Sequence, residues 1–117
     1  MVVDDDAGIR EVLHAFLQPE GYPAVTAADC REALEQLRSG LRPAVILLDL
    51  VMPGMDGRAF WKLKQADPAL ASIPVVVISG DEAAARFAAE LGCEFIQKPF
   101  ELERLLRVVK RHCFAPA

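Results

Sequence analysis

Short apolar runs alternate along the chain with longer stretches in which apolar residues recur every three or four positions. Short runs bounded by Gly, Pro and charged residues are typical of strands. They predict strands at residues 1–4, 24–26, 44–49, 73–78 and 95–97. The recurring positions predict one helix after each strand, with a single face turned to the core.

The apolar positions of each helix indicate which side chains should be buried. They are Ile9, Val12, Leu13, Phe16 and Leu17 in the first helix, Ala33, Leu34 and Leu37 in the second, Ala59, Phe60 and Leu63 in the third, and Leu102, Leu105, Leu106 and Val109 in the last. The fourth helix is the Ala-rich segment 82–91, closed by Gly92. Asp6 is expected to cap the first helix, and Asp29 with Glu32 the second.

Five strands alternating with five helices indicate a doubly wound α/β fold. The runs at 44–49 and 73–78 are apolar almost throughout, which predicts strands buried on both faces. Right-handed crossovers between parallel strands then place helices on both sides of the sheet. The length of 117 residues suits one domain spanning residues 1–117.

Composition and charge reduce the number of function classes that fit this chain. A net charge of −4 argues against direct nucleic-acid binding, which needs a basic face. No apolar run approaches the roughly 20 residues of a membrane helix, and no signal peptide is visible, so we expect a cytoplasmic protein. Cys30, Cys93 and Cys113 lack metal-binding spacing and are expected to be small buried or half-buried side chains. His14 and His112 are expected to have surface or packing roles.

Polar residues end four of the five predicted strands. Asp4, Asp5 and Asp6 follow the first strand, and Asp49 ends the third. Ser79 and Lys98 follow the fourth and the fifth. The carboxyl ends of parallel strands meet at one edge of the sheet, where ligands bind, so these side chains should gather there. Three carboxylates in one pocket would repel each other unless a cation joined them.

Four motifs in this order resemble the receiver domain of bacterial two-component response regulators, over essentially the whole chain. They are Val-Val-Asp-Asp-Asp at 2–6, Leu-Leu-Asp-Leu-Val-Met-Pro-Gly-Met-Asp-Gly at 47–57, Val-Ile-Ser-Gly at 77–80 and Lys-Pro-Phe at 98–100. The resemblance implies a flavodoxin-like fold whose five-stranded sheet has the order 2-1-3-4-5. It also implies a cis peptide bond between Lys98 and Pro99.

The resemblance implies a role for each polar residue at this edge. Asp49 would be the phosphoacceptor, assisted by Ser79 and Lys98. The metal ligands would be Asp4, Asp5 and Asp49 with the backbone carbonyl of Val51, and Asp5 is the more direct ligand of the acidic pair. The ion would be Mg²⁺ or Mn²⁺, which suits an all-oxygen shell. Ser79 and Phe95 would form the switch, with Phe95 in the place of an aromatic residue that is often Tyr.

The function implied is a signalling switch in a phosphorelay rather than a turnover enzyme. A sensor histidine kinase or a histidine phosphotransfer protein would phosphorylate Asp49, and the modified domain would act on an effector that this sequence does not identify. Phosphorylation-dependent homodimerisation is a further expectation. Only 19 positions separate Ser79 from Lys98, which is about three fewer than in many receivers, or nearly one helical turn.

Three alternatives stay open. An Mg²⁺-dependent aspartyl-phosphate phosphohydrolase of the haloacid-dehalogenase type usually has a second Asp two positions after the nucleophile, where this chain has Val51. A flavodoxin-like cofactor binder would need a phosphate-binding loop after the first strand, where Asp4, Asp5 and Asp6 would repel phosphate. An unphosphorylated scaffold would not need Asp5, Asp49, Ser79 and Lys98 together.

Overall fold

A computed structural model of the chain describes residues 1–21, 24–49, 57–80 and 82–113. In this part of the chain, five parallel strands form one sheet in the order β2-β1-β3-β4-β5. The strands are β1 (Val2–Val3), β2 (Thr26–Ala27), β3 (Ile46–Asp49), β4 (Val75–Ser79) and β5 (Glu94–Gln97). The predicted flavodoxin-like fold and its strand order are confirmed.

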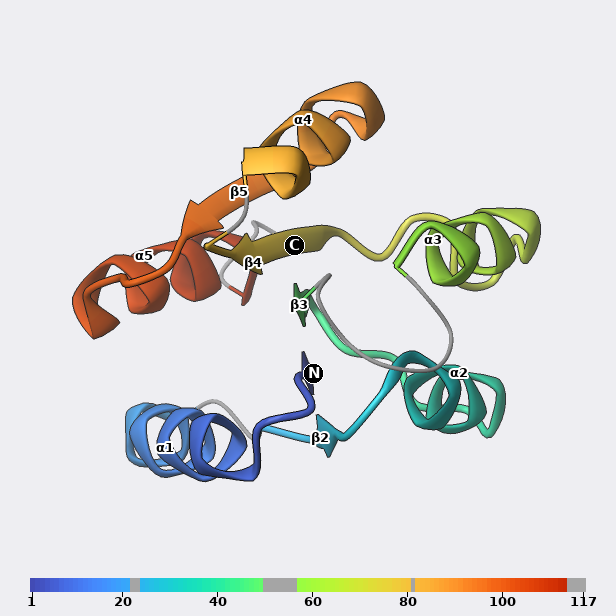
Figure 1. Ribbon diagram of the computed structural model, residues 1–117. Helices are drawn as coiled ribbons and strands as arrows, with labels where there is room; N and C mark the ends of the chain where they lie inside the picture. Colours follow the sequence, from blue (N-terminus) through green and yellow to red (C-terminus); the bar gives the residue numbers. More distant parts are fainter. Residues whose placement is uncertain (22–23, 50–56, 81, 114–117) are drawn as a thin grey trace.

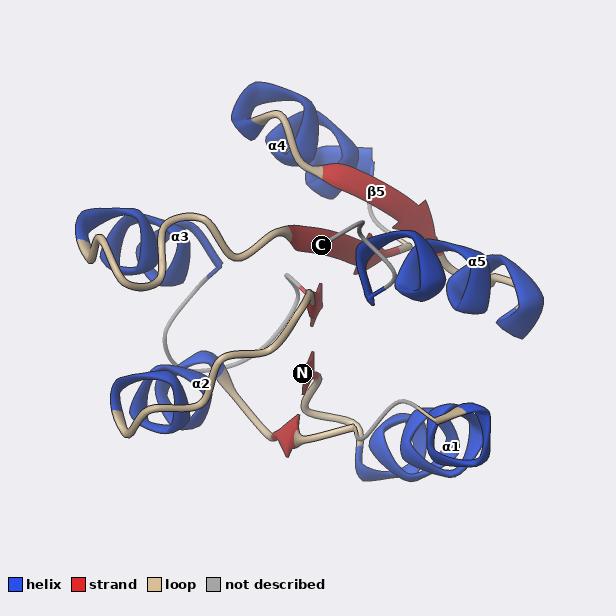
Figure 2. Cartoon of the chain, turned by 180° about the vertical axis from the view of Figure 1, so that it is seen from behind, coloured by secondary structure: helices blue, strands red, loops and turns tan. Residues whose placement is uncertain are grey.

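Helices cover both faces of this sheet (Figures 1 and 2). They are α1 (Ala7–Leu17), α2 (Cys30–Arg38), α3 (Gly57–Ala66), α4 (Glu82–Leu91) and α5 (Leu102–Cys113), and a short 3-10 turn, η1 (Gln18–Glu20), follows α1. Helices α1 and α5 lie on one face, and α2, α3 and α4 lie on the other. No helix among the described residues is long and apolar enough to cross a membrane.

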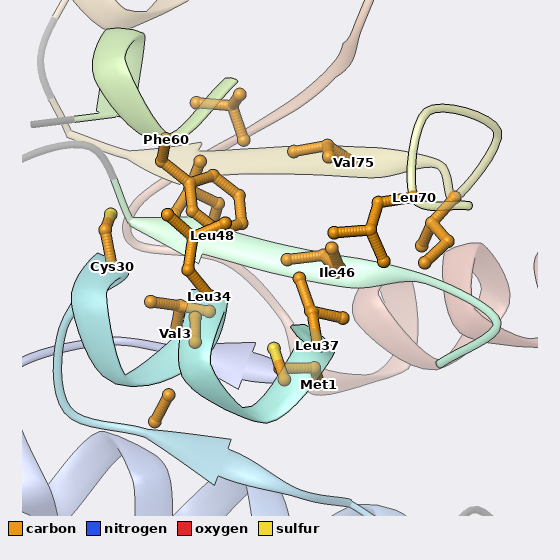
Figure 3. Close-up of a cluster of buried hydrophobic side chains, with 14 of the residues drawn as sticks. Met1, Val3, Cys30, Leu34, Leu37, Ile46, Leu48, Phe60, Leu70 and Val75 are labelled. Atoms are coloured by element: carbon orange, nitrogen blue, oxygen red, sulfur yellow. The ribbon is translucent and has the colours of Figure 1, made fainter. Parts of the chain in front are cut away.

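Each face of the sheet buries its own hydrophobic cluster, and β3 contributes to both. Ile46 and Leu48 point into the cluster with α2 and α3, where Figure 3 shows Leu48 near Leu34 and Phe60 and Ile46 near Leu37. Leu47 belongs to the opposite cluster, with α1 and α5. Successive side chains of a strand point to opposite faces. A strand covered on both faces therefore needs a continuous apolar run, and the sequence of β3 provides one.

Local hydrogen bonds begin the first two helices as predicted. The Asp6 side chain accepts hydrogen bonds from the backbone N–H of Gly8 (2.8 Å) and Ile9 (3.3 Å). Asp29 accepts one from Glu32 N–H at 2.8 Å, and the Glu32 side chain accepts one from Ala28 N–H at 3.2 Å. These carboxylates satisfy N–H groups that have no partner inside the helix.

Two predicted core positions were wrong. Val12 is 53% exposed and Leu63 is 39% exposed. The buried face of α1 contains Leu13, and the neighbouring Val12 is rotated about 100° away from Leu13 around the helix axis. On α3 the residue buried one turn after Phe60 is Lys64 rather than Leu63, because positions i and i+4 share a face.

Lys64 is a cation buried without a carboxylate partner in the described residues. Its ammonium donates hydrogen bonds to Gln65 Oε1 (2.8 Å) and to the Ala71 carbonyl (3.2 Å), and it lies 5.1 Å from the centre of the Trp61 ring. The hydrogen bond to Ala71 ties α3 to the segment that leads into β4. Burial lowers the pKa of Lys64, and the neighbouring Cys93 partly opposes this shift.

Replacing Lys64 with Met should stabilise the fold at pH 7 by about 1 kcal/mol, because an apolar side chain of similar length avoids burying a charge. Since the pKa of Lys64 is lower in the folded state, the folded chain binds fewer protons than the unfolded chain as the pH approaches 10.5. Wild-type stability then rises relative to the variant, and the gain from Met should shrink. Urea unfolding at pH 7 and pH 10 tests this. Lys62→Met, at an exposed site on α3, is the control, and a gain independent of pH would contradict the explanation.

The remaining side-chain expectations are met where the structure describes them. Cys30 is buried and Cys93 is half-buried; the side chain of Cys113 lies outside the described residues. His14 is exposed, and His112 is half-buried and contacts Glu94.

Candidate functional site

The register of the sheet brings the polar strand ends together. Val3 pairs with Leu48, which places the residues that follow them, Asp4 and Asp49, side by side. Asp49 pairs with Ile78, and Ser79 pairs with Gln97, the residue before Lys98. The four consecutive strands β1, β3, β4 and β5 therefore present these polar residues along one edge of the sheet, as the sequence predicted.

Lys98 bridges two of the carboxylates. Its Nζ lies 3.2 Å from Asp4 Oδ2 and 3.2 Å from Asp49 Oδ2. Both carboxylates are buried, with side-chain exposures of 6% and 9%. Burial alone would lower the pKa of Lys98, but the charges of Asp49 and Asp4 and their hydrogen bonds raise it above its ordinary value. The amine is therefore held as a cation, directed at Asp49.

Asp4 is anchored through all of its polar groups. Its backbone N–H donates to the Ala27 carbonyl (3.1 Å), and its backbone carbonyl accepts from Arg10 Nη1 (2.6 Å). Its Oδ1 accepts from the Asp6 N–H (2.9 Å), while Oδ2 accepts from Lys98. Asp5, in contrast, is exposed, and its side chain has no ion pair with any described residue.

Asp4, Asp5 and Asp49 form an acidic cluster in which one carboxylate oxygen from each lies within 4.8 Å of the others. Lys98 is the cation paired with this cluster among the described residues, so three negative charges face one positive charge. Such a surplus of carboxylate oxygen suits a hard divalent cation. The acidic cluster could therefore bind a metal ion. The predicted carbonyl ligand, Val51, lies outside the described residues.

Ser79 ends β4, the strand that pairs with the strand of Asp49, and Phe95 lies on β5, which pairs with β4 on its other side. Ser79 is 2% exposed, and its backbone carbonyl accepts a hydrogen bond of 3.0 Å from Lys98 N–H. Phe95 is half-buried against the hydrophobic cluster that β3 shares with α2 and α3. The peptide bond between Lys98 and Pro99 is cis, as the sequence predicted.

Sequence reasoning missed one residue at this edge. Arg10 contacts the backbone of the acidic segment, not a side chain. Its position four residues after Asp6 gave no signal beyond a polar place on an amphipathic helix. A contact between a long side chain and a backbone carbonyl depends on how α1 leaves β1, and that geometry is not encoded in a residue pattern.

Comparison with known proteins gives one consistent result. The family model of the response regulator receiver domain matches residues 1–110. The chain is 34% identical over 113 residues to the DNA-binding response regulator MtrA of Mycolicibacterium paratuberculosis, covering 94% of this chain and 48% of MtrA. It is 38% identical over 111 residues to the DNA-binding transcriptional regulator NtrC of Escherichia coli, covering 94% of this chain and 24% of NtrC.

The solved structure of the chemotaxis protein CheY4 from Vibrio cholerae is also similar, with a TM-score of 0.83 and 32% sequence identity. The match covers 94% of this chain and 93% of that protein. The chain thus spans about half the length of MtrA but nearly the whole of CheY4.

Proposed function

The chain belongs to the family of response regulator receiver domains, and on that premise we propose that Asp49 is the residue on which it accepts a phosphoryl group. The domain is a phosphorylation-dependent switch of a two-component system. The observation that carries the assignment to Asp49 is the Lys98 ammonium, 3.2 Å from Asp49 Oδ2. A buried carboxylate held beside a cation, at the carboxyl end of a parallel sheet, suits a nucleophile that attacks phosphorus.

The transfer forms one bond and breaks one. An Asp49 carboxylate oxygen donates an electron pair to phosphorus, and the P–N bond to the donor histidine breaks as the nitrogen keeps the bonding pair. With a small acyl phosphate as donor, a P–O bond breaks instead. Lys98 balances negative charge on the transferring oxygens, and the Ser79 hydroxyl donates a hydrogen bond to one of them.

We assign Mg²⁺, or Mn²⁺ in its place, to the acidic cluster. Asp5 and Asp49 are proposed to hold the ion directly, supported by Asp4 and by the backbone carbonyl of Val51. Asp4 is the weaker candidate for direct contact because both of its carboxylate oxygens already accept hydrogen bonds. The bound ion would supply further positive charge to balance the negative oxygens of the transferring phosphoryl group.

Mg²⁺ binding should depend strongly on Asp5 and little on Asp6. Asp5→Asn should weaken binding by roughly tenfold or more, because the site has few protein ligands and loses one charge. Asp6→Asn removes the same charge from the neighbouring position and keeps a good helix cap. Calorimetric titration with Mg²⁺ compares the two variants, and equal losses would mean that Asp5 is not a ligand.

The function is tested by incubating the wild-type chain with acetyl phosphate and Mg²⁺ and measuring its intact mass. One phosphoryl group should be added, and addition should stop when a chelator removes the metal. A chain that stays unmodified under conditions in which a known receiver is labelled would refute the proposal. Turnover of a small phosphoester would instead revive the phosphohydrolase alternative, which is disfavoured because Val51 stands where that class usually has its general acid.

Membership of this family indicates the classes of partner. Response regulators act with histidine kinases and effector domains, and we propose a sensor histidine kinase or a histidine phosphotransfer protein as the donor for Asp49. We treat residues 1–117 as one receiver domain that works in the cytoplasm. Its output is proposed to be an effector domain or protein, with homodimerisation on phosphorylation as one form of signalling.

Phe95 is proposed to report the state of Asp49 through Ser79. Phe has no hydroxyl to hold in solvent, so Phe95 should stay packed inward before phosphorylation as well as after it. NMR spectra with and without beryllofluoride, a phosphoryl mimic, should therefore differ less around residue 95 in wild type than in Phe95→Tyr. Equal spectral changes in the two proteins would remove Phe95 from the switch.

A further inference from the structure

Arg10 is attached twice to the segment that carries the acidic pair. Its backbone N–H donates to the Asp6 carbonyl at 3.1 Å, as the first turn of α1 requires. Its side chain reaches back, and Nη1 donates to the Asp4 carbonyl at 2.6 Å. Carboxylates lie at the same edge of the sheet, yet the guanidinium forms no ion pair with a described residue. Arg10 therefore binds the backbone of the acidic segment and leaves its carboxylates available.

The carbonyl that Arg10 binds belongs to the peptide group joining Asp4 to Asp5. A peptide group is planar, so fixing its oxygen also fixes the direction of its nitrogen and of the next Cα. The side chain of Asp4 is already held by Asp6 N–H and Lys98. The side chain of Asp5 has no comparable contact among the described residues, so its direction depends on the orientation of this peptide.

We propose that Arg10 is a positioning residue for the metal site, holding the Asp4–Asp5 peptide so that the Asp5 carboxylate faces Asp49. The inference rests on the proposed role of the acidic cluster in binding Mg²⁺. In this role Arg10 strengthens Mg²⁺ binding, whereas its positive charge alone would weaken it. A nearby cation should repel Mg²⁺, so a guanidinium that acted only through its charge would weaken metal binding. A guanidinium that positions a ligand strengthens it.

The two roles of Arg10 are distinguished by whether its replacement weakens or strengthens Mg²⁺ binding. Arg10→Met removes the hydrogen bond and the charge but keeps an unbranched side chain. Calorimetric titration with Mg²⁺ should show binding about tenfold weaker than in wild type, a typical loss when a group that orients a metal ligand is removed. Arg38→Met, in the exposed last turn of α2, removes the same charge without contacting the acidic segment. Its Mg²⁺ affinity should match wild type.

A second variant separates the positioning effect of the Arg10 side chain from the effect of its positive charge. Arg10→Lys keeps the positive charge but loses the forked, planar donor group, so binding should still weaken. It also serves if Arg10→Met does not fold, which far-ultraviolet circular dichroism would show. Equal or tighter Mg²⁺ binding by the folded variants would overturn the role of Arg10 and leave the proposed function standing. A wild-type chain that binds no Mg²⁺ would overturn both.

Discussion

Replacing Asp49 with Asn should abolish stable phosphorylation of the chain. The amide is a much poorer nucleophile than a carboxylate, and the substitution removes one of the two negative charges that Lys98 contacts. Intact mass after incubation with acetyl phosphate and Mg²⁺ should show one added phosphoryl group in wild type and none in Asp49→Asn. This is the largest single effect that the proposed function predicts, because no other residue is expected to replace the acceptor.

Asp6→Asn is the matched control for that experiment. It makes the same chemical change in an aspartate whose side chain caps α1, and Asn is an equally good cap. Its phosphorylation should remain close to that of wild type. Labelling of Asp49→Asn to the wild-type extent would mean that another carboxylate is the acceptor.

Replacing Lys98 with Met should slow phosphorylation by roughly 10²–10³-fold. Removing one preorganised group that stabilises charge in a transition state typically has an effect of this size. The ammonium is in place before any donor arrives, because Asp4 and Asp49 hold it at 3.2 Å from an oxygen of each. The rate of phosphoryl uptake from acetyl phosphate at saturating Mg²⁺ measures the loss.

Mg²⁺ binding separates this effect from damage to the site. Lys98→Met removes a cation next to the acidic cluster, so the affinity for Mg²⁺ should be unchanged or higher. Lys110→Met, at an exposed position on α5, should match wild type in both measurements. A wild-type phosphorylation rate in Lys98→Met would show that the ammonium does not act on the transferring group.

The sequence predicted the carboxyl edge of the sheet because its residues follow strands at positions set by topology. Asp4, Asp49, Ser79 and Lys98 each stand at the end of a strand or one residue beyond it, and parallel strands bring such positions together. The ion pair between Lys98 and Asp49 spans β4, which lies between β5 and β3, so it also depends on the reach of the long lysine side chain.

Features that depend on tertiary contacts were harder to predict. Lys64 is buried because the segment entering β4 offers the Ala71 carbonyl to its ammonium, whereas a lysine in a sequence usually indicates a surface position. Val12 is exposed because α1 turns its apolar centre, at Leu13, to the sheet. The role of Arg10 was missed for the same reason as the burial of Lys64, because the acceptor of its hydrogen bond is a backbone carbonyl. Every residue has such a carbonyl, so the sequence does not indicate which one a long side chain will bind.

The most direct test of the central claim is to locate the phosphoryl group in the wild-type chain. Borohydride reduces an aspartyl phosphate to homoserine, which tandem mass spectrometry of proteolytic peptides can assign to a position. After incubation with acetyl phosphate and Mg²⁺, homoserine should appear at position 49 and not at positions 4, 5 or 6. Homoserine at one of the other three positions, or a phosphorylated chain without homoserine at position 49, would contradict the assignment of Asp49 as the phosphoacceptor.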